Sequence, residues 1–290
     1  GRISASPDAG DHPLVSEGVL TRTVADTAAL LDVLAGYEPG DATWAPPPVR
    51  PFRESRTDSR TGASPSGLRV GLLLTPPTPA DLEPSCVRAA EDAARLLADF
   101  GHHVEVFELQ PLTEQEWGAF DDVWAVLAAE GVAAGGAVLG RTPTVDDVEP
   151  LTWMLYEKGR ALDALAYRSA FADLQRVARR VVGATLAYDV LVTPALAERP
   201  VPIATITGME SPDPLGALSR SNRFTPYTAL WNVTGQPAVS LPLCHGDDGL
   251  PLGIQLVGPP AGERLLIALA EQLEQAAPWA QRLSPVAIRG

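Results

Sequence analysis

The sequence predicts an α/β fold in which a mixed, largely parallel sheet carries helices on both faces. The clearest sign is a strand–helix–strand pattern over residues 68–109. An apolar run at 68–74 precedes an amphipathic helix that opens at Pro84, and apolar residues then alternate from Val104. A unit of this size implies parallel strands joined by a crossover helix. Three more short apolar runs alternate with helical segments and extend the pattern: 189–193, 238–241 and 253–257.

Caps and apolar spacing mark the helices. Thr23 can cap a helix that ends at Gly36, with Asp26 in the reciprocal position of a capping box. Residues 113–186 are mostly helical, and we expect the pair Gly135-Gly136 to interrupt them, because glycine disfavours a helix interior. The closing helix presents one apolar face, formed by Leu266, Leu269, Leu273 and Ala276.

One domain over residues 1–290 is the expected organisation, because a chain of this length can bury a sizeable core. Residues 38–67 are rich in Pro, Ser and Arg and lack apolar periodicity, so we expect an exposed connection. The net charge of −14 argues against a nucleic-acid partner, since such binding depends on clustered Lys and Arg. No uncharged apolar run approaches 18 residues, so we expect no membrane partner and a cytoplasmic protein.

The residues give no self-contained catalytic set. A phosphate-binding loop, a dinucleotide-binding glycine motif, a zinc-protease motif and a nucleophile elbow are all missing from the sequence. The adjacent residues His102 and His103 would point to opposite faces of a strand, so they predict no metal site, and we expect no cofactor. The only lysine, Lys158, lies late in an amphipathic helix, where a solvated side chain is the usual role.

The most informative stretch is 222–242. Phe224, Tyr227 and Trp231 recur at helical spacing, which predicts one short helix with an aromatic face. Asn232 and Gly235 are suited to ending that helix, since both tolerate left-handed backbone. The run 238–241 then predicts a short buried strand. Core packing and a substrate pocket both remain open as the purpose of these aromatic residues.

Four segments in this order resemble the amidase signature family, which comprises serine hydrolases of carboxylic amides. They are GRIS at 1–4 with GVLTRTVADTAALLDVLAG at 18–36, YDVLVTPALAE at 188–198, the stretch 222–242 and GLPLGIQLVGPP at 249–260. The resemblance implies acyl transfer by a serine, with a lysine as base and a second serine, in a cis peptide, relaying the proton. In that family these residues precede the GRIS segment.

The resemblance therefore implies a chain that carries the C-terminal part of such a fold, incomplete at its N-terminus. We expect the catalytic residues to lie upstream and the isolated chain to be inactive, with the missing N-terminal segment as its partner. The resemblance also implies that this part supplies one wall of an apolar acyl pocket. The candidates are Phe224, Tyr227, Thr228, Trp231, Trp153, Tyr156, Trp117 and Trp124, with Asn232 and Gly235 setting the turn.

The expected substrate is a small-molecule amide whose identity is not readable from the sequence, and a homodimer remains open. One alternative is a protein similar to the glutamine-hydrolysing component of tRNA-dependent amidotransferases, which would need partner subunits. Another is a non-catalytic module that binds ligands or partners. An upstream segment containing the lysine and the serines would favour a hydrolase over that module.

Overall fold

The computed structural model describes residues 1–4, 12, 14–56, 65–202, 204–207 and 213–282. Their sheet has five strands in the order β2-β1-β3-β5-β4. The strands are β1 (Arg69–Leu72), β2 (His103–Val106), β3 (Val190–Pro194), β4 (Ala238–His245) and β5 (Pro251–Val257). β1 pairs in parallel with β2 and β3, and β5 pairs antiparallel with β3 and β4. Only β5 therefore runs against the others, which confirms the mixed, largely parallel sheet.

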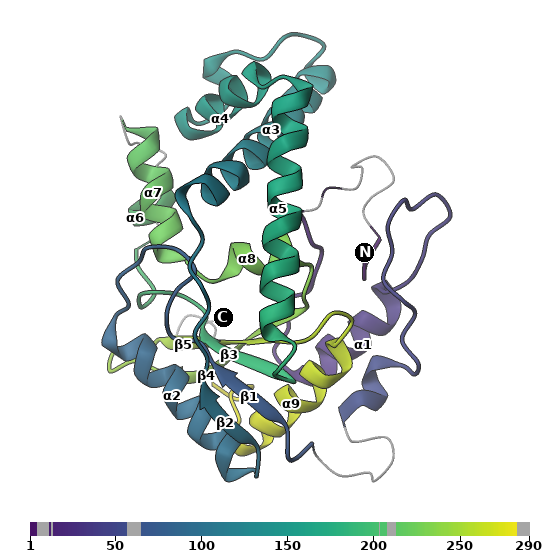
Figure 1. The fold of residues 1–290 in the computed structure, drawn as a ribbon, viewed down its shortest axis with the longest axis vertical. Helices are drawn as coiled ribbons and strands as arrows, with labels where there is room; N and C mark the ends of the chain where they lie inside the picture. Colours follow the sequence, from purple (N-terminus) through teal and green to yellow (C-terminus); the bar gives the residue numbers. More distant parts are fainter. Residues whose placement is uncertain (5–11, 13, 57–64, 203, 208–212, 283–290) are drawn as a thin grey trace, which may run out of the picture.

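Helices cover both faces of this sheet, as predicted (Figure 1). The longer helices are α1 (Val24–Leu34), α2 (Pro84–Asp99), α3 (Glu114–Leu139), α4 (Pro150–Ala161), α5 (Ala164–Thr185), α7 (Pro214–Phe224) and α9 (Glu263–Ala276). Shorter helical segments are α6 (Ala204–Thr207), α8 (Thr228–Thr234) and the 3₁₀ turns η1 (Phe52–Arg56) and η2 (Val145–Asp147).

The side chains of β3 show how the two faces are divided. Val190 and Val192 pack into a core cluster with α2 and α9, whereas Leu191 packs into a second cluster with α5 and α8. Because successive side chains of a strand point to opposite faces, this alternation places the helix layers on opposite sides. A sheet buried on both faces explains why β3 reads as a continuous apolar run.

The region formed by α3, α4 and the first half of α5 extends away from the sheet (Figure 1). Thr113 caps α3 with a full capping box that includes Glu116. The helix then runs on to Leu139, so the predicted interruption at Gly135-Gly136 is wrong. Gly136 is required there by packing, since an added Cβ would lie 2.6 Å from the ring of Pro143. The helix ends instead at Gly140, which has left-handed backbone.

α3 is long and apolar enough to cross a membrane by length and composition alone, and it is alone in this among the described helices. It packs here against α4 and α5. Core helices of globular proteins also meet that criterion, so it does not establish a membrane span.

The connection at 38–67 is described except for 57–64. Most of its described residues are exposed, but Phe52 is fully buried in η1, which lies against α1 and α9. The side chain of Asp32 on α1 accepts hydrogen bonds from the backbone N–H groups of Phe52 and Arg53. This connection is therefore anchored to the core at η1. The extent of a single domain over 1–290 stays a prediction.

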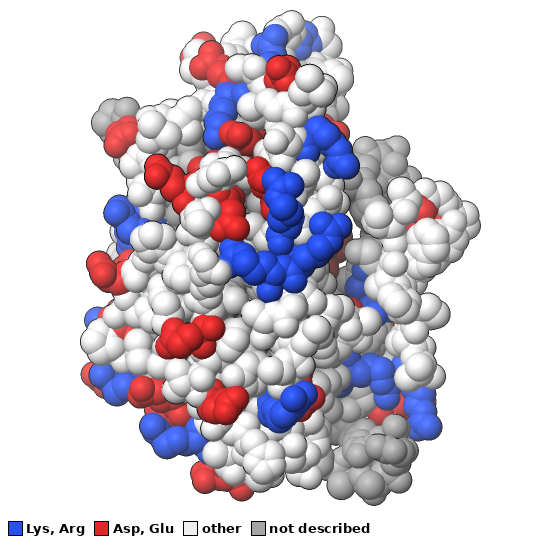
Figure 2. Space-filling model, viewed as in Figure 1, with Lys and Arg blue, Asp and Glu red and all other residues white. Residues whose placement is uncertain are grey.

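One face of the molecule carries a group of basic side chains across its middle, over α5 (Figure 2). Two arginines of α5 have acidic partners nearby. Arg176 pairs with Asp173 on the same helix, and Arg180 binds both carboxylate oxygens of Glu116 at 2.8 and 2.9 Å. The arginine face of α5 is thus partly neutralised by its neighbours, as is usual for a solvated helix face.

Candidate functional site

The aromatic stretch forms two helices rather than the predicted one. α7 ends at Phe224 and α8 begins at Thr228, and Pro226 lies between them. Proline lacks the backbone N–H that a continuous helix needs, which accounts for the break. The strand that follows is also longer than predicted, because β4 reaches His245, and Ala238 and Ser240 in it are exposed rather than buried.

Tyr227 joins this stretch to the segment that follows β1. Its side chain is fully buried, and its hydroxyl donates a hydrogen bond of 2.5 Å to the carbonyl oxygen of Leu74. Burial raises the pKa of the Tyr227 hydroxyl strongly, and the nearby Cys86 raises it further. The phenol therefore stays protonated at neutral pH and acts as a fixed hydrogen-bond donor.

α8 has one buried and one exposed face. Trp231 is 3% exposed and packs with Leu230 into the cluster shared with α5. Its Nε1 is buried and has no hydrogen-bond partner among the described residues. Thr228, one turn earlier, is exposed. The two pocket candidates on α8 therefore differ in exposure. Trp231 lies on the buried face of the helix, whereas Thr228 lies on its exposed face.

Asn232 and Gly235 hold the turn after α8. The side-chain amide of Asn232 donates a hydrogen bond of 2.6 Å to the carbonyl oxygen of Leu14, and Leu14 is buried against α3 and α5. Gly235 adopts a φ of 68° and its N–H donates to the carbonyl of Trp231. Asn232 itself lies within the helix, so Gly235 alone provides the left-handed end.

The remaining aromatic candidates lie on the extended helical region. On α3, the rings of Trp117 and Phe120 meet edge to face with 5.5 Å between their centroids, and Trp124 stacks on Phe120 at 6.1 Å. On α4, the ring centroids of Trp153 and Tyr156 lie 5.0 Å apart, and both side chains pack against the later part of α3.

The structure therefore divides the candidates into three groups, at α7–α8, on α3 and on α4. Trp231 and Tyr227 share a cluster with the sheet, and Tyr156 belongs to a different cluster with α3. Both α3 tryptophans contact Phe120, which packs against the cluster of Leu14 and α5. None of these residues lines either of the two cavities described below. Their role in binding substrate stays a prediction.

The sheet carries a row of polar side chains that the sequence analysis did not predict. Thr193 on β3 and Ser240 on β4 both lie opposite Gln255 on β5. Thr193 and Gln255 are buried, and the Gln255 amide donates a hydrogen bond of 3.1 Å to the Thr193 hydroxyl. The row shares a sheet face with Leu191, the face that α5 and α8 cover. The strand pairing alone reveals it, because the three residues are far apart in the sequence.

Lys158 is not placed as a catalytic base. Its ammonium group lies 2.9 Å from the carboxylate of Asp122 on α3, and its side chain is 41% exposed. Beside this pair, desolvation raises the pKa of the Asp121 carboxyl group. The contact between Lys158 and Asp122 is a solvated ion pair between two packed helices.

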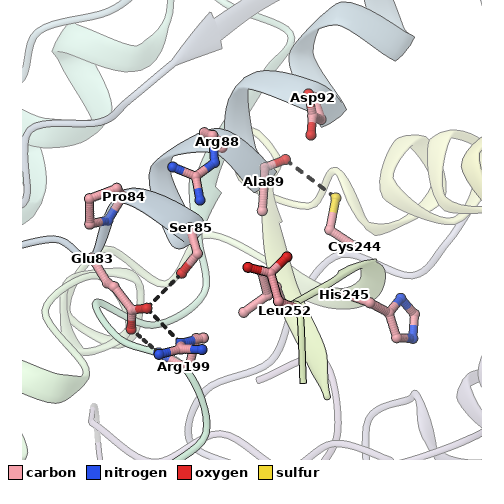
Figure 3. Close-up of a pocket in the computed structure, with 12 residues that line it drawn as sticks. Glu83, Pro84, Ser85, Arg88, Ala89, Asp92, Arg199, Cys244, His245 and Leu252 are labelled. Carbon is pink, nitrogen blue, oxygen red and sulfur yellow. Dashed lines mark hydrogen bonds and ion pairs between the residues drawn. The ribbon is translucent and has the colours of Figure 1, made fainter. Parts of the chain in front are cut away.

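The first cavity, of about 350 Å³, lies between the start of α2 and the β4–β5 hairpin (Figure 3). Charged groups surround it, among them Arg88, Arg199 and Asp247, while Ala89 and Leu252 contribute apolar surface. The second cavity, of about 190 Å³, lies where α5 leads into β3, and includes the buried Gln236. Within the described part of the chain, no group of three or more His, Cys, Asp or Glu side chains is arranged to hold a metal ion.

Comparison with known proteins gives a consistent answer. A family model described as Amidase matches residues 1–267. The 6-aminohexanoate-cyclic-dimer hydrolases of Pseudomonas sp. strain NK87 and Paenarthrobacter ureafaciens are each 33% identical to the chain over 97% of its length. The alignment covers 58% of each of these relatives, so the chain spans less than two thirds of their length.

Solved structures agree. A 6-aminohexanoate cyclic dimer hydrolase complexed with substrate superposes with a TM-score of 0.82 at 32% identity, over 91% of this chain and 55% of that one. A bacterial aryl acylamidase of the amidase signature family superposes with a TM-score of 0.78 at 23% identity, over 97% and 57%, and supports the fold alone. The fold and the matched segments define an amidase-type α/β protein. The chain belongs to the amidase signature family.

Proposed function

We propose that this chain is the C-terminal part of a hydrolase of small-molecule amides. The observation that carries the proposal is the 33% identity over 97% of the chain with two 6-aminohexanoate-cyclic-dimer hydrolases. The agreement in fold with a substrate complex of such an enzyme supports it. Cyclic or linear amides of aliphatic amino acids are accordingly the first substrates to test.

We further propose that the nucleophilic serine, the cis serine and the lysine base lie in the portion of the relatives that this chain does not cover. Two observations support this. The alignment covers only 58% of the length of each of the two 6-aminohexanoate-cyclic-dimer hydrolases. The only lysine, Lys158, is exposed and engaged with Asp122. Amide cleavage needs a nucleophile, a base and an oxyanion site held together, and Lys158 offers no such arrangement.

This part of the enzyme would then supply one wall of the acyl pocket. Thr228 lies exposed on α8, with Trp231 packed beneath the same helix. On α3, Trp124 is 38% exposed and offers apolar surface. Because these groups bind rather than react, Thr228→Val should change the preference between acyl groups. An equal loss of kcat/KM across all amides would instead indicate a packing role.

The experiment compares residues 1–290 alone with the same residues extended by the preceding codons of the gene. Both proteins are assayed with 6-aminohexanoate cyclic dimer, aryl and alkyl amides, and glutamine. We expect turnover only in the extended protein, abolished by replacing an upstream serine with alanine. Turnover by residues 1–290 that a serine substitution within them removes would overturn the placement of the catalytic residues. An extended protein inactive on every amide would overturn the proposed activity.

A further inference from the structure

Several of the charged residues that line the first cavity are neutralised by ion pairs with neighbouring residues. Glu83 lies 2.6 Å from the Arg199 guanidinium, and the backbone N–H of Arg199 also donates to the same carboxylate at 3.0 Å. These contacts hold the pKa of the Glu83 carboxyl below its usual range, so both partners are ionised and neutralise each other. Figure 3 shows this pair on one side of the cavity and His245 on the other.

Two more groups at the rim are also satisfied or neutral. Asp92 pairs with Arg95 one turn later on α2. Desolvation lowers the pKa of the His245 imidazole, and the adjacent Arg282, 2.6 Å from Nδ1, lowers it further. A histidine with a lowered pKa is uncharged at neutral pH. Neither Asp92 nor His245 therefore contributes an uncompensated charge.

Two opposite charges then remain among the residues that line the cavity. Arg88 on α2 and Asp247 in the β4–β5 turn both line the cavity, and neither has an ion-pair or hydrogen-bond partner in the described part of the chain. The lining of the same cavity also includes the apolar residues Ala89 and Leu252. A ligand that matches these features carries a carboxylate at one end, an ammonium at the other and an aliphatic spacer.

We propose that this cavity binds a small zwitterion, an aliphatic amino acid whose carboxylate pairs with Arg88 and whose ammonium group pairs with Asp247. The volume of about 350 Å³ accommodates a molecule of this size. Because both charged residues are exposed, the binding is weak and falls with added salt. The inference stands on the cavity and does not depend on amide hydrolysis, so it survives or fails separately from the proposed function.

The test is calorimetric titration of the purified protein with three probes of equal chain length: 6-aminohexanoate, hexanoate and hexylamine. We expect saturable binding of 6-aminohexanoate at about millimolar concentration and at least about fivefold weaker binding of either singly charged probe. In Arg88→Gln, 6-aminohexanoate should bind no better than hexylamine. In Asp247→Asn, it should bind no better than hexanoate, while Arg88→Lys should keep part of the preference.

Matched controls are Arg176→Gln and Asp146→Asn, which change exposed charges away from the cavity and should leave binding unchanged. Unchanged melting temperatures confirm that all variants fold. Equal binding of hexanoate and 6-aminohexanoate would identify an anion site and overturn the proposal. Binding that survives both Arg88→Gln and Asp247→Asn, or no saturable binding up to about 10 mM, would overturn it as well.

Discussion

The side-chain amide of Asn232 donates a hydrogen bond to the carbonyl oxygen of Leu14, 218 positions earlier in the chain. The bond fastens α8 to a segment that lies against α3 and α5, so one residue connects three parts of the fold. Its length of 2.6 Å and the burial of Leu14 make it a structural bond rather than an incidental surface contact.

Asn232→Ala should lower the free energy of unfolding by about 1–2 kcal/mol, because the Leu14 carbonyl loses its donor in a buried setting. Chemical denaturation measures this change. The matched control is Asn222→Ala in α7, which should stay within about 0.5 kcal/mol of the parent protein. A loss of the same size at both positions would show that the bond to Leu14 is unimportant.

Tyr227→Phe should change how stability depends on alkaline pH. The folded protein keeps the Tyr227 proton above the ordinary tyrosine pKa of about 10, whereas the unfolded chain releases it there. The folded state then binds more protons, so stability falls as pH rises above about 10. Tyr188 and both cysteines have raised pKa values too, so the informative quantity is the difference between parent and variant.

In denaturation curves from pH 8 to about 11, Tyr227→Phe should be less stable at pH 8, through the lost bond to Leu74, and should lose less as pH rises. Tyr167→Phe serves as the control and should follow the parent curve. Parallel curves for the parent protein and Tyr227→Phe would contradict the assignment of a raised pKa to this hydroxyl.

Replacing glycine by alanine should lower stability at the C-terminal end of α8 and raise it inside α5. Gly235→Ala places a Cβ on left-handed backbone and should cost about 1 kcal/mol. Gly183→Ala lies at an exposed position inside α5, and no atom beyond the adjacent helix backbone lies within 4 Å of the new Cβ in the described part of the chain. This substitution should stabilise the protein by about 0.5–1 kcal/mol. Thermal unfolding of both variants tests the pair, and a matching sign would refute this account of the α8 end.

The substitution Arg2→Lys should destabilise the protein although it keeps the positive charge. Its guanidinium binds Glu263 through two hydrogen bonds of 2.7 and 3.1 Å, and the two side chains are only 15% and 14% exposed. Lysine keeps the charge but not the paired geometry, so Arg2→Lys should cost about 1–2 kcal/mol. Arg53→Lys, at an ion pair of 3.8 Å with a 68% exposed arginine, should be nearly neutral in the same denaturation assay.

The strands and most helices could be predicted because their signals are local. The β3 run, the proline at the start of α2 and the Thr23 cap each act within a few residues of their own position. The sequence predictions were wrong at Gly135-Gly136 and at Pro226, because non-local packing or a competing local signal decided the structure there. Packing of Gly136 against Pro143 outweighed the low helix propensity of glycine, and a single proline outweighed the aromatic spacing.

The candidate site was less predictable for a related reason. Aromatic residues in one sequence stretch look like one pocket, yet the fold sends Trp231 into the sheet cluster and leaves Thr228 outside. The Thr193–Gln255–Ser240 row and the cavity beside Arg88 are assembled from separate elements. Only a three-dimensional structure brings such residues together, because no periodicity in the sequence records strand order.

The position of β5 constrains the order in which the protein can be completed during synthesis. β5 lies between β3 and β4 in the sheet although it is made after both, so each of these strands has an unpaired edge until β5 is available. The bond between Arg2 and Glu263, 261 positions apart, also cannot form until α9 has been synthesised. At about 5–20 residues per second, synthesis from the end of β3 to the end of β5 takes roughly 3–13 seconds, and during this interval the unpaired strand edges are open to pairing with other chains.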